Sequence, residues 1–115
     1  MSKVAISFAS APRRDVVELA LCAEELGYER VWIYDSPAVY GDVWIALARI
    51  AERTRRIGLG TGVAVTHLRH VMVTASAIAD IEELAPGRLA CAFGTGFSAR
   101  LAMGQKPLRW SLVKQ

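Results

Sequence analysis

The sequence predicts an α/β fold with a parallel sheet, and two observations support this prediction. Short apolar segments typical of strands alternate with segments of helical periodicity, and the strands begin near residues 3, 30, 56 and 88. A repeat of about 30 residues is the usual size of a strand with its crossover helix. The segments VWI and LACAF are continuously apolar, as expected for strands that are buried on both faces. Alternating units of this kind form parallel sheets with right-handed crossovers.

The first unit is predicted to contain a strand over residues 3–9 and a helix that ends before Gly27. Pro12 suits a first helical turn, and the apolar side chains that follow fall on one helical face: Val16, Leu19, Ala20 and Ala23. Gly27 stands where a helix commonly ends in a left-handed glycine.

The second unit is predicted to contain a strand over residues 30–34 and a helix that Asp42 caps and that ends near Thr54. The segment RVWIY is rich in β-branched and aromatic residues. The apolar positions of the helix recur at helical spacing: Trp44, Leu47, Ala48 and Ala51.

The remaining chain predicts a third strand over residues 56–63, a helix over 71–84 and a fourth strand over 88–94. The dipeptide Pro86-Gly87 ends the helix. Ser98 is predicted to cap a last short helix that runs through Met103. Two architectures fit this order, an open doubly wound sheet and part of a (β/α) barrel.

Composition indicates one globular domain over residues 1–115. The chain is 53% hydrophobic and 22% charged, which argues against disorder. Its net charge of +3 comes from scattered Lys and Arg, so we expect no nucleic-acid partner. We expect no membrane association either, because no apolar run approaches the length of a membrane span.

Cysteine and histidine usage predicts no metal site. Cys22 and Cys91 lie in separate apolar stretches and are expected to be buried free thiols in a reducing cytoplasm. No C-x-x-C motif is present, and His67 and His70 alone make a poor set of metal ligands.

The segment IGLGTGV, residues 57–63, places a glycine at every second position of a predicted strand. It matches neither G-x-G-x-x-G nor a phosphate-binding P-loop. A bulge, an unusual peptide conformation or close approach of the backbone to a flat ligand would explain these glycines. A helix that crosses closely over the smooth row is the structural alternative.

In both architectures ligands bind at the carboxyl ends of the strands. Those ends carry Ser10, Asp35, Ser36, residues 62–70 and residues 94–98. Asp35 suits a polar contact with a ligand, or alternatively a turn cap beside Pro37. His67 or His70 could transfer protons near neutral pH, or simply be solvated loop residues.

Four segments carry a resemblance to a known family: AEELGYERVWIYDS, ALARIAERTRRIGLGTGV, IADIEELAPGRLACAFGTG and RLAMGQKPLRW. Together they resemble the N-terminal part of the bacterial luciferase-like monooxygenases. Within that family, the chain is most similar to the deazaflavin-dependent oxidoreductases. The resemblance runs from about residue 3 to residue 110 and implies a TIM barrel, of which this chain would form the first half with about four βα units.

The resemblance also implies a site. It predicts deazaflavin (coenzyme F420) or FMN as cofactor and a non-prolyl cis peptide at Gly62-Val63 beneath the ring. Asp35 matches an aspartate at the end of the second strand, and His67 lies in the loop after the third, so these two are the predicted catalytic residues. The predicted cofactor-binding residues are Gly62, Val63, Thr66, Gly94, Thr95 and Gly96. The family commonly has histidine after the aspartate, where this chain has Ser36.

The implied function is hydride transfer or monooxygenation of a small organic substrate in the cytoplasm. The alternative is a non-catalytic flavin-binding or dimerising remnant of the family. Since a TIM barrel takes about 250 residues, we expect a fragment; otherwise two copies would associate to bury the open strand edges. A doubly wound nucleotide-binding domain is disfavoured by the glycine spacing.

Overall fold

The computed structural model describes residues 4–115, and its elements follow the predicted alternation. The strands are β1 (Ser7–Ser10), β2 (Arg30–Ile33), β3 (Gly58–Val65) and β4 (Leu89–Gly94). The helices are α1 (Val16–Glu25), α2 (Val43–Arg53), α3 (Val71–Leu84), α4 (Phe97–Ala102) and α5 (Trp110–Val113). The first predicted strand is shorter than expected, and its residue 3 lies outside the described residues.

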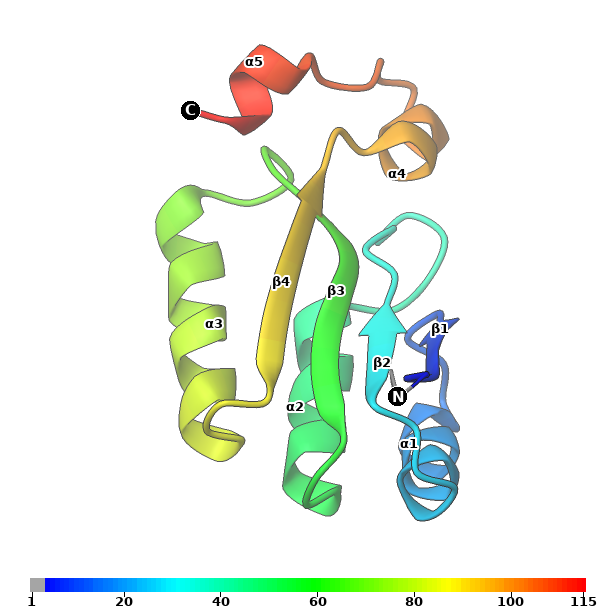
Figure 1. Cartoon of the computed structure of the whole chain (residues 1–115). Coiled ribbons are helices and arrows are strands. Elements are labelled where there is room, and N and C mark those ends of the chain that lie inside the picture. Colours follow the sequence, from blue (N-terminus) through cyan, green and yellow to red (C-terminus); the bar gives the residue numbers. More distant parts are fainter. Residues whose placement is uncertain (1–3) are drawn as a thin grey trace.

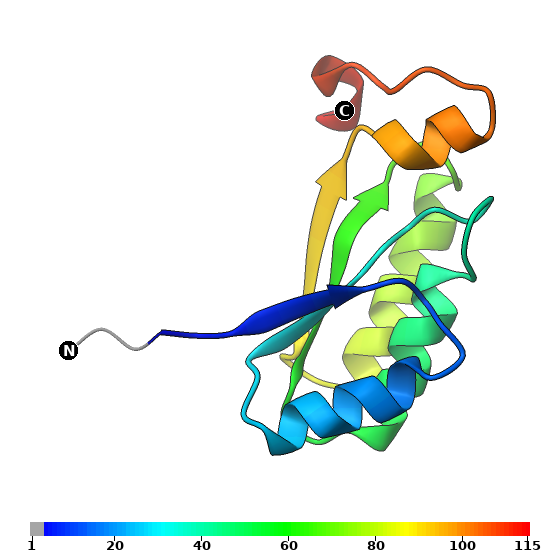
Figure 2. The ribbon, with the colours of Figure 1, turned by 90° about the vertical axis from the view of Figure 1, so that its right-hand side faces the viewer.

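All four strands are parallel and lie in the order β1-β2-β3-β4. Helices α1, α2 and α3 lie along one face of this sheet (Figures 1 and 2). A doubly wound sheet carries helices on both faces and reverses its strand order. Sequential strands with all crossover helices on one face are instead the arrangement of a barrel wall, so the barrel prediction is confirmed over the doubly wound one.

The core lies between the sheet and helix α2. Val31, Ile33 and Leu59 project from the strands, and Leu47 and Ile50 meet them from α2, all fully buried. Helix α2 therefore fixes the centre of the sheet. Among helices of the described chain, none is both long enough and apolar enough to cross a bilayer.

The glycine row of β3 is explained by side chains of β2. Arg30 pairs with Gly58 and Trp32 with Gly60 along the ladder. A Cβ on Gly60 would collide with the Trp32 ring, and one on Gly58 with the Arg30 guanidinium, whose carbon lies 5.4 Å from the Trp32 ring centroid. These two side chains thus lie across the row, so the alternative of a helix crossing there is wrong.

Three local predictions need correction. Ser98 lies inside α4 rather than capping it, because Gly96 takes a left-handed conformation (φ 80°) and starts the helix earlier. Pro12 precedes α1, whose N-cap is Asp15. Cys22 is an exposed free thiol on α1, whereas Cys91 is half-buried on β4 and also free.

Candidate functional site

A cavity of about 560 Å³ is lined by residues at the carboxyl ends of β2, β3 and β4 and by residues of α4 and α5. Helices α4 and α5 lie beyond these strand ends (Figure 1). Six of the eight predicted site residues line this cavity: Asp35, Gly62, Val63, Gly94, Thr95 and Gly96. We call it the first cavity. The structure therefore brings together residues that are up to 61 positions apart in the chain.

Aromatic side chains form much of the wall of the first cavity: Tyr34, Tyr40, Phe93, Phe97 and Trp110. The rings of Tyr34 and Tyr40 lie 6.3 Å apart, centroid to centroid. Polar groups are few, among them the hydroxyls of Ser36, Thr95 and Ser98. A cavity of this size, apolar and aromatic with a few polar groups, suits a flat ring system.

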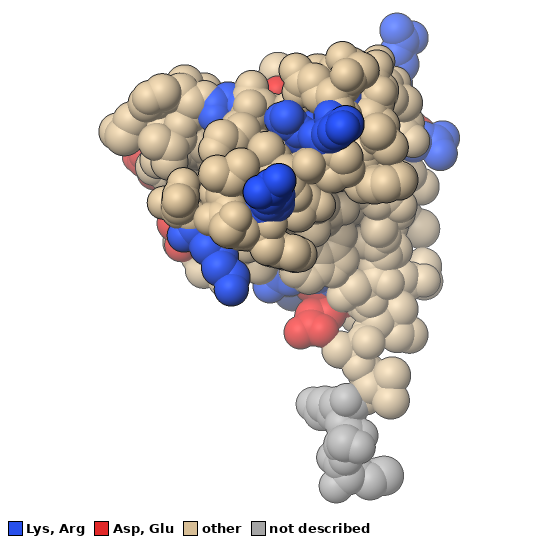
Figure 3. Space-filling model, turned by 90° about the horizontal axis from the view of Figure 1, so that it is seen from above, with Lys and Arg blue, Asp and Glu red and all other residues tan. Residues whose placement is uncertain are grey.

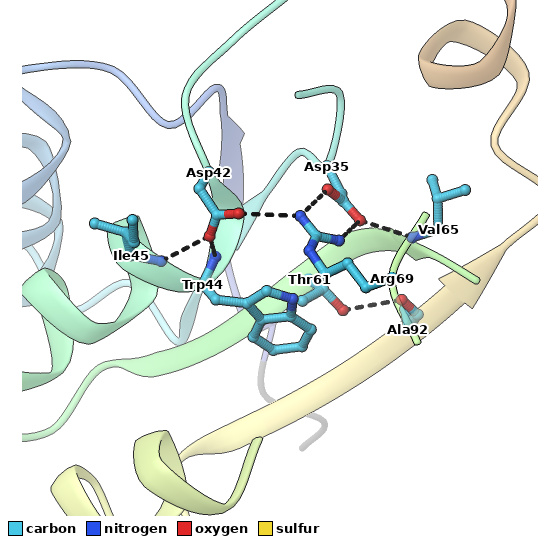
Figure 4. A network of polar contacts seen from close by, with 8 residues as sticks. All are labelled: Asp35, Asp42, Trp44, Ile45, Thr61, Val65, Arg69 and Ala92. Atoms are coloured by element: carbon cyan, nitrogen blue, oxygen red, sulfur yellow. Dashed lines mark hydrogen bonds and ion pairs between the residues drawn. The ribbon is translucent and has the colours of Figure 1, made fainter. Parts of the chain in front are cut away.

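The floor of the first cavity is an irregular part of β3. The peptide bond between Gly62 and Val63 is cis, as the resemblance implied, and the register with β4 shifts between Thr61 and Ala64. The Thr61 hydroxyl donates to the Ala92 carbonyl at 2.9 Å and bridges the two strands at this point (Figure 4). A bulge or similar irregularity, one of the explanations considered for the glycine row, is thus present at the end of β3.

Gly94 and Gly96 leave space for side chains of the irregular part of β3. A Cβ on Gly94 would collide with the Val63 side chain, and a Cβ on Gly96 with that of Val65. The segment Gly94-Thr95-Gly96 therefore leaves room for two valines of β3. Val63 remains 38% exposed and presents an apolar surface to the cavity.

Asp35 lies at the edge of the first cavity with its carboxylate fully engaged. Its side chain is 1% exposed. Arg69 donates to both carboxylate oxygens at 2.9 Å, and the Val65 backbone N–H donates to Oδ2 at 2.9 Å (Figure 4). A buried carboxylate needs such partners to remain charged. The catalytic role of Asp35 stays a prediction.

Arg69 is the residue that sequence reasoning missed. It also donates to Asp42 at 3.2 Å, and the other Asp42 oxygen caps α2 by accepting from the N–H groups of Trp44 and Ile45 (Figure 4). The bidentate bond to Asp35 raises the pKa of Arg69 above its ordinary value, although burial opposes this. An aspartate at the end of a buried strand was the available signal that a cation had to lie nearby.

Thr66 and His67 lie elsewhere. They line a second cavity, also of about 560 Å³, together with Trp44, Arg69 and the start of α3. Val65 and Phe93 line both cavities and lie between them. His67 is exposed, adopts a left-handed conformation (φ 65°), and its Nδ1 lies 3.2 Å from the Thr66 hydroxyl. The proton-transfer role of His67 stays a prediction.

His70, the other histidine of this loop, accepts a hydrogen bond at Nδ1 from the Met72 N–H at 3.2 Å. It thereby caps α3. Within residues 4–115, no three His, Cys, Asp or Glu side chains group as metal ligands would.

The face above the first cavity is basic. Lys and Arg side chains gather on it (Figure 3). Residues 97–115, which form this cover, contain Arg100, Lys106, Arg109 and Lys114 and no acidic residue. Such a surface attracts anions.

Comparison with known proteins identifies the family of the chain. Residues 3–107 match the family model described as luciferase-like monooxygenase. The chain is 37% identical over 98 residues to the 5,10-methylenetetrahydromethanopterin reductase of Methanolobus tindarius, which covers 83% of this chain and 29% of the relative. It is 36% identical over 84 residues to the 4-hydroxyprotoasukamycin monooxygenase of Streptomyces nodosus subsp. asukaensis, and this alignment covers 70% of this chain and 23% of the relative.

The fold is similar to that of the coenzyme F420 dependent tetrahydromethanopterin reductase from Methanopyrus kandleri. The TM-score is 0.81 at 28% identity, and the alignment covers 90% of this chain and 30% of the other. The chain thus spans about a third or less of each of these three proteins. Because the family model matches nearly the whole chain, the chain belongs to the luciferase-like monooxygenase family.

Proposed function

We propose that the chain supplies cofactor-binding elements of an oxidoreductase that uses coenzyme F420 or FMN. The observation that carries the proposal is the first cavity, in which an apolar floor at Gly62-Val63 faces walls of tyrosine, phenylalanine and tryptophan. The relatives support it, since one is described as F420 dependent and another as a monooxygenase.

A deazaflavin or flavin supplies hydride transfer when bound, and a flavin can in addition activate oxygen. The chain's own residues would bind and orient the ring. Val63 would contact its face, and the aromatic side chains would exclude water from it. The Thr95 and Ser98 hydroxyls would offer hydrogen bonds to the polar edge of the ring. A small organic substrate would complete the reaction.

Residues 97–115 would contribute through their charge. Both FMN and coenzyme F420 are anions, and the basic cover over the cavity would favour their approach. This is a long-range effect and adds to the contacts that the ring itself makes.

A titration tests the proposal. We expect the fluorescence of FMN, of coenzyme F420 or of both to be quenched when the chain is added. Val63→Arg should abolish the quenching, because it places a charged side chain on the cavity floor. Leu26→Arg is the matched control, since Leu26 is 70% exposed at the end of α1 and lines neither cavity. The proposal would be contradicted if the chain quenched the fluorescence of neither cofactor, or if the Val63→Arg variant quenched it as strongly as the parent chain.

The alternative, a flavin-binding or dimerising remnant without turnover, is favoured by exposed apolar side chains on α3. Val71, Met72 and Val73 are each more than half exposed. Sedimentation velocity separates the cases of association. A well-folded monomer at micromolar concentration excludes pairing of two copies, while cofactor binding without turnover supports the remnant.

A further inference from the structure

Arg69 connects three segments near the carboxyl ends of β2 and β3, and it lines the second cavity. It binds Asp35 after β2, it contacts Asp42 at the start of α2, and it belongs to the loop that follows β3. Its side chain is only 16% exposed. We propose that Arg69 is a positioning residue for the cofactor, because it fixes Asp35 and, through Asp35, the backbone that follows the cis peptide. This inference rests on the proposed function.

The fixed carboxylate holds β3 at a defined place. Asp35 Oδ2 accepts from the Val65 N–H, two residues after Val63. Val63 forms the floor of the first cavity, and Val65 forms part of its wall. The Asp35 carboxylate therefore joins the end of β2 to the end of β3 beside the first cavity.

Without Arg69 the carboxylate would keep only the Val65 N–H as partner. A buried charge with one donor is destabilised and turns toward water. This movement loosens the bond to Val65 and with it the floor of the cavity. Arg69 itself does not line the first cavity, so it acts on the cofactor position through Asp35.

Arg88 offers a matched control at the other end of the sheet. It too is a partly buried arginine that joins separate segments, since it donates to the Ile57 carbonyl at 2.9 Å and to the Thr54 carbonyl at 3.2 Å. It does not line the first cavity. Arg88→Gln should lower the melting temperature without changing cofactor affinity.

The experiment compares four variants with the parent chain: Arg69→Gln, Arg69→Lys, Arg88→Gln and the double variant Arg69→Gln/Asp35→Asn. The affinities for FMN and coenzyme F420 are measured well below each melting temperature. We expect Arg69→Gln to weaken binding at least about tenfold, the equivalent of about 1.4 kcal/mol. Arg69→Lys should recover part of the loss. The double variant should recover more, because it removes the unpaired charge and keeps two hydrogen-bonding side chains.

A second readout needs no cofactor. Hydrogen exchange of the Val65 amide should accelerate in Arg69→Gln relative to Arg88→Gln at matched stability. Unchanged Val65 protection in Arg69→Gln would overturn the inference, and so would equal losses of affinity in Arg69→Gln and Arg88→Gln. A parent chain that binds neither cofactor refutes the proposed function instead, and the Val65 amide then still decides whether Arg69 positions this backbone.

Discussion

Trp32 explains a feature that the sequence shows but cannot interpret. Alternate glycines in β3 suggest that the backbone is left open for a ligand. The Trp32 ring, however, occupies the space beside Gly60, and Arg30 occupies the space beside Gly58. Only the last glycine of the row, Gly62, borders the first cavity. A Cβ on Gly62 would also lie 2.9 Å from the Trp32 Cβ, so packing against Trp32 and Arg30 accounts for all three glycines, and Gly62 in addition borders the cavity.

Gly60→Ala is accordingly expected to destabilise the fold by about 1–3 kcal/mol through overpacking against Trp32. The carbonyl of Ala90 lies 3.0 Å from the added Cβ and limits relaxation in the other direction. Urea unfolding measures the change. In a Trp32→Ala background the same substitution should cost much less, and an equal cost in both backgrounds would show that the ring is not the obstacle.

Glu24 illustrates how one carboxylate can organise a turn. Its Oε2 accepts from the backbone N–H groups of Arg55, Arg56 and Ile57 at 2.9, 2.6 and 2.9 Å. Burial by itself raises the pKa of Glu24. The three donors and the charge of Arg56 outweigh this and lower the pKa below its ordinary value. The helix end of α1 is thereby joined to the start of β3.

The lowered pKa predicts a pH dependence of stability. Because the folded state favours the charged form, Glu24 stabilises the chain above its unfolded pKa, and this contribution is lost as the pH falls through the lower folded value. Glu24→Gln should cost about 1 kcal/mol at neutral pH. The difference from the parent should vanish in acid, as followed by thermal melts across the pH range. The exposed neighbour Glu25 supplies the control, and a similar effect of Glu25→Gln would contradict the assignment.

At the scale of elements, α1 and α2 begin in different ways. Asp42 caps α2 through hydrogen bonds of 2.8 and 3.1 Å from Trp44 and Ile45. Asp15 stands at the same position of α1 and makes no capping hydrogen bond; it pairs with Arg13 on the surface. An aspartate at the N-cap therefore contributes more to the stability of α2 than to that of α1.

We expect Asp42→Ala to destabilise the chain by about 1–2 kcal/mol, because it removes a cap. It also removes one partner of Arg69. Asp15→Ala should cost less than about 0.5 kcal/mol, as is usual for an exposed ion pair. Denaturant titrations of both variants test this, and equal losses would argue against the capping role of Asp42.

The elements themselves were largely predictable, for physical reasons that differ from case to case. Apolar periodicity places α1, α2 and α3, and the Asp42 cap follows from its place before an apolar run. The predicted start of α4 was wrong because the helix begins after the left-handed Gly96, which a capping rule for serine does not consider. Arg69 could not be assigned, since its partner Asp35 is 34 residues away and their meeting depends on the packed sheet.

At the scale of the molecule, the strand order decides what periodicity left open. The positions of helices and strands fit both a barrel and a doubly wound sheet. The sequential order β1-β2-β3-β4, with α1, α2 and α3 on one face, distinguishes them (Figure 2). Six of the eight predicted site residues then meet in one cavity, whereas Thr66 and His67 follow the chain beyond Val65 into another.

The distribution of charge predicts a salt effect on binding. The basic cover, residues 97–115, should attract the phosphate of FMN but not the uncharged side chain of riboflavin. We expect FMN affinity to fall as salt rises and riboflavin affinity to change little. Fluorescence titrations at several ionic strengths measure both. Equal salt dependence of the two ligands would show that the cover does not contribute.

The central claim is that the ring of the cofactor lies against Gly62-Val63 in the first cavity. Amide chemical shifts of the labelled chain, followed while FMN or coenzyme F420 is added, test it most directly. We expect the largest changes at Gly62, Val63, Thr95 and Gly96 and smaller changes at Thr66 and His67. Changes centred on Thr66, His67 and the start of α3, with Gly62 and Val63 unaffected, would contradict it.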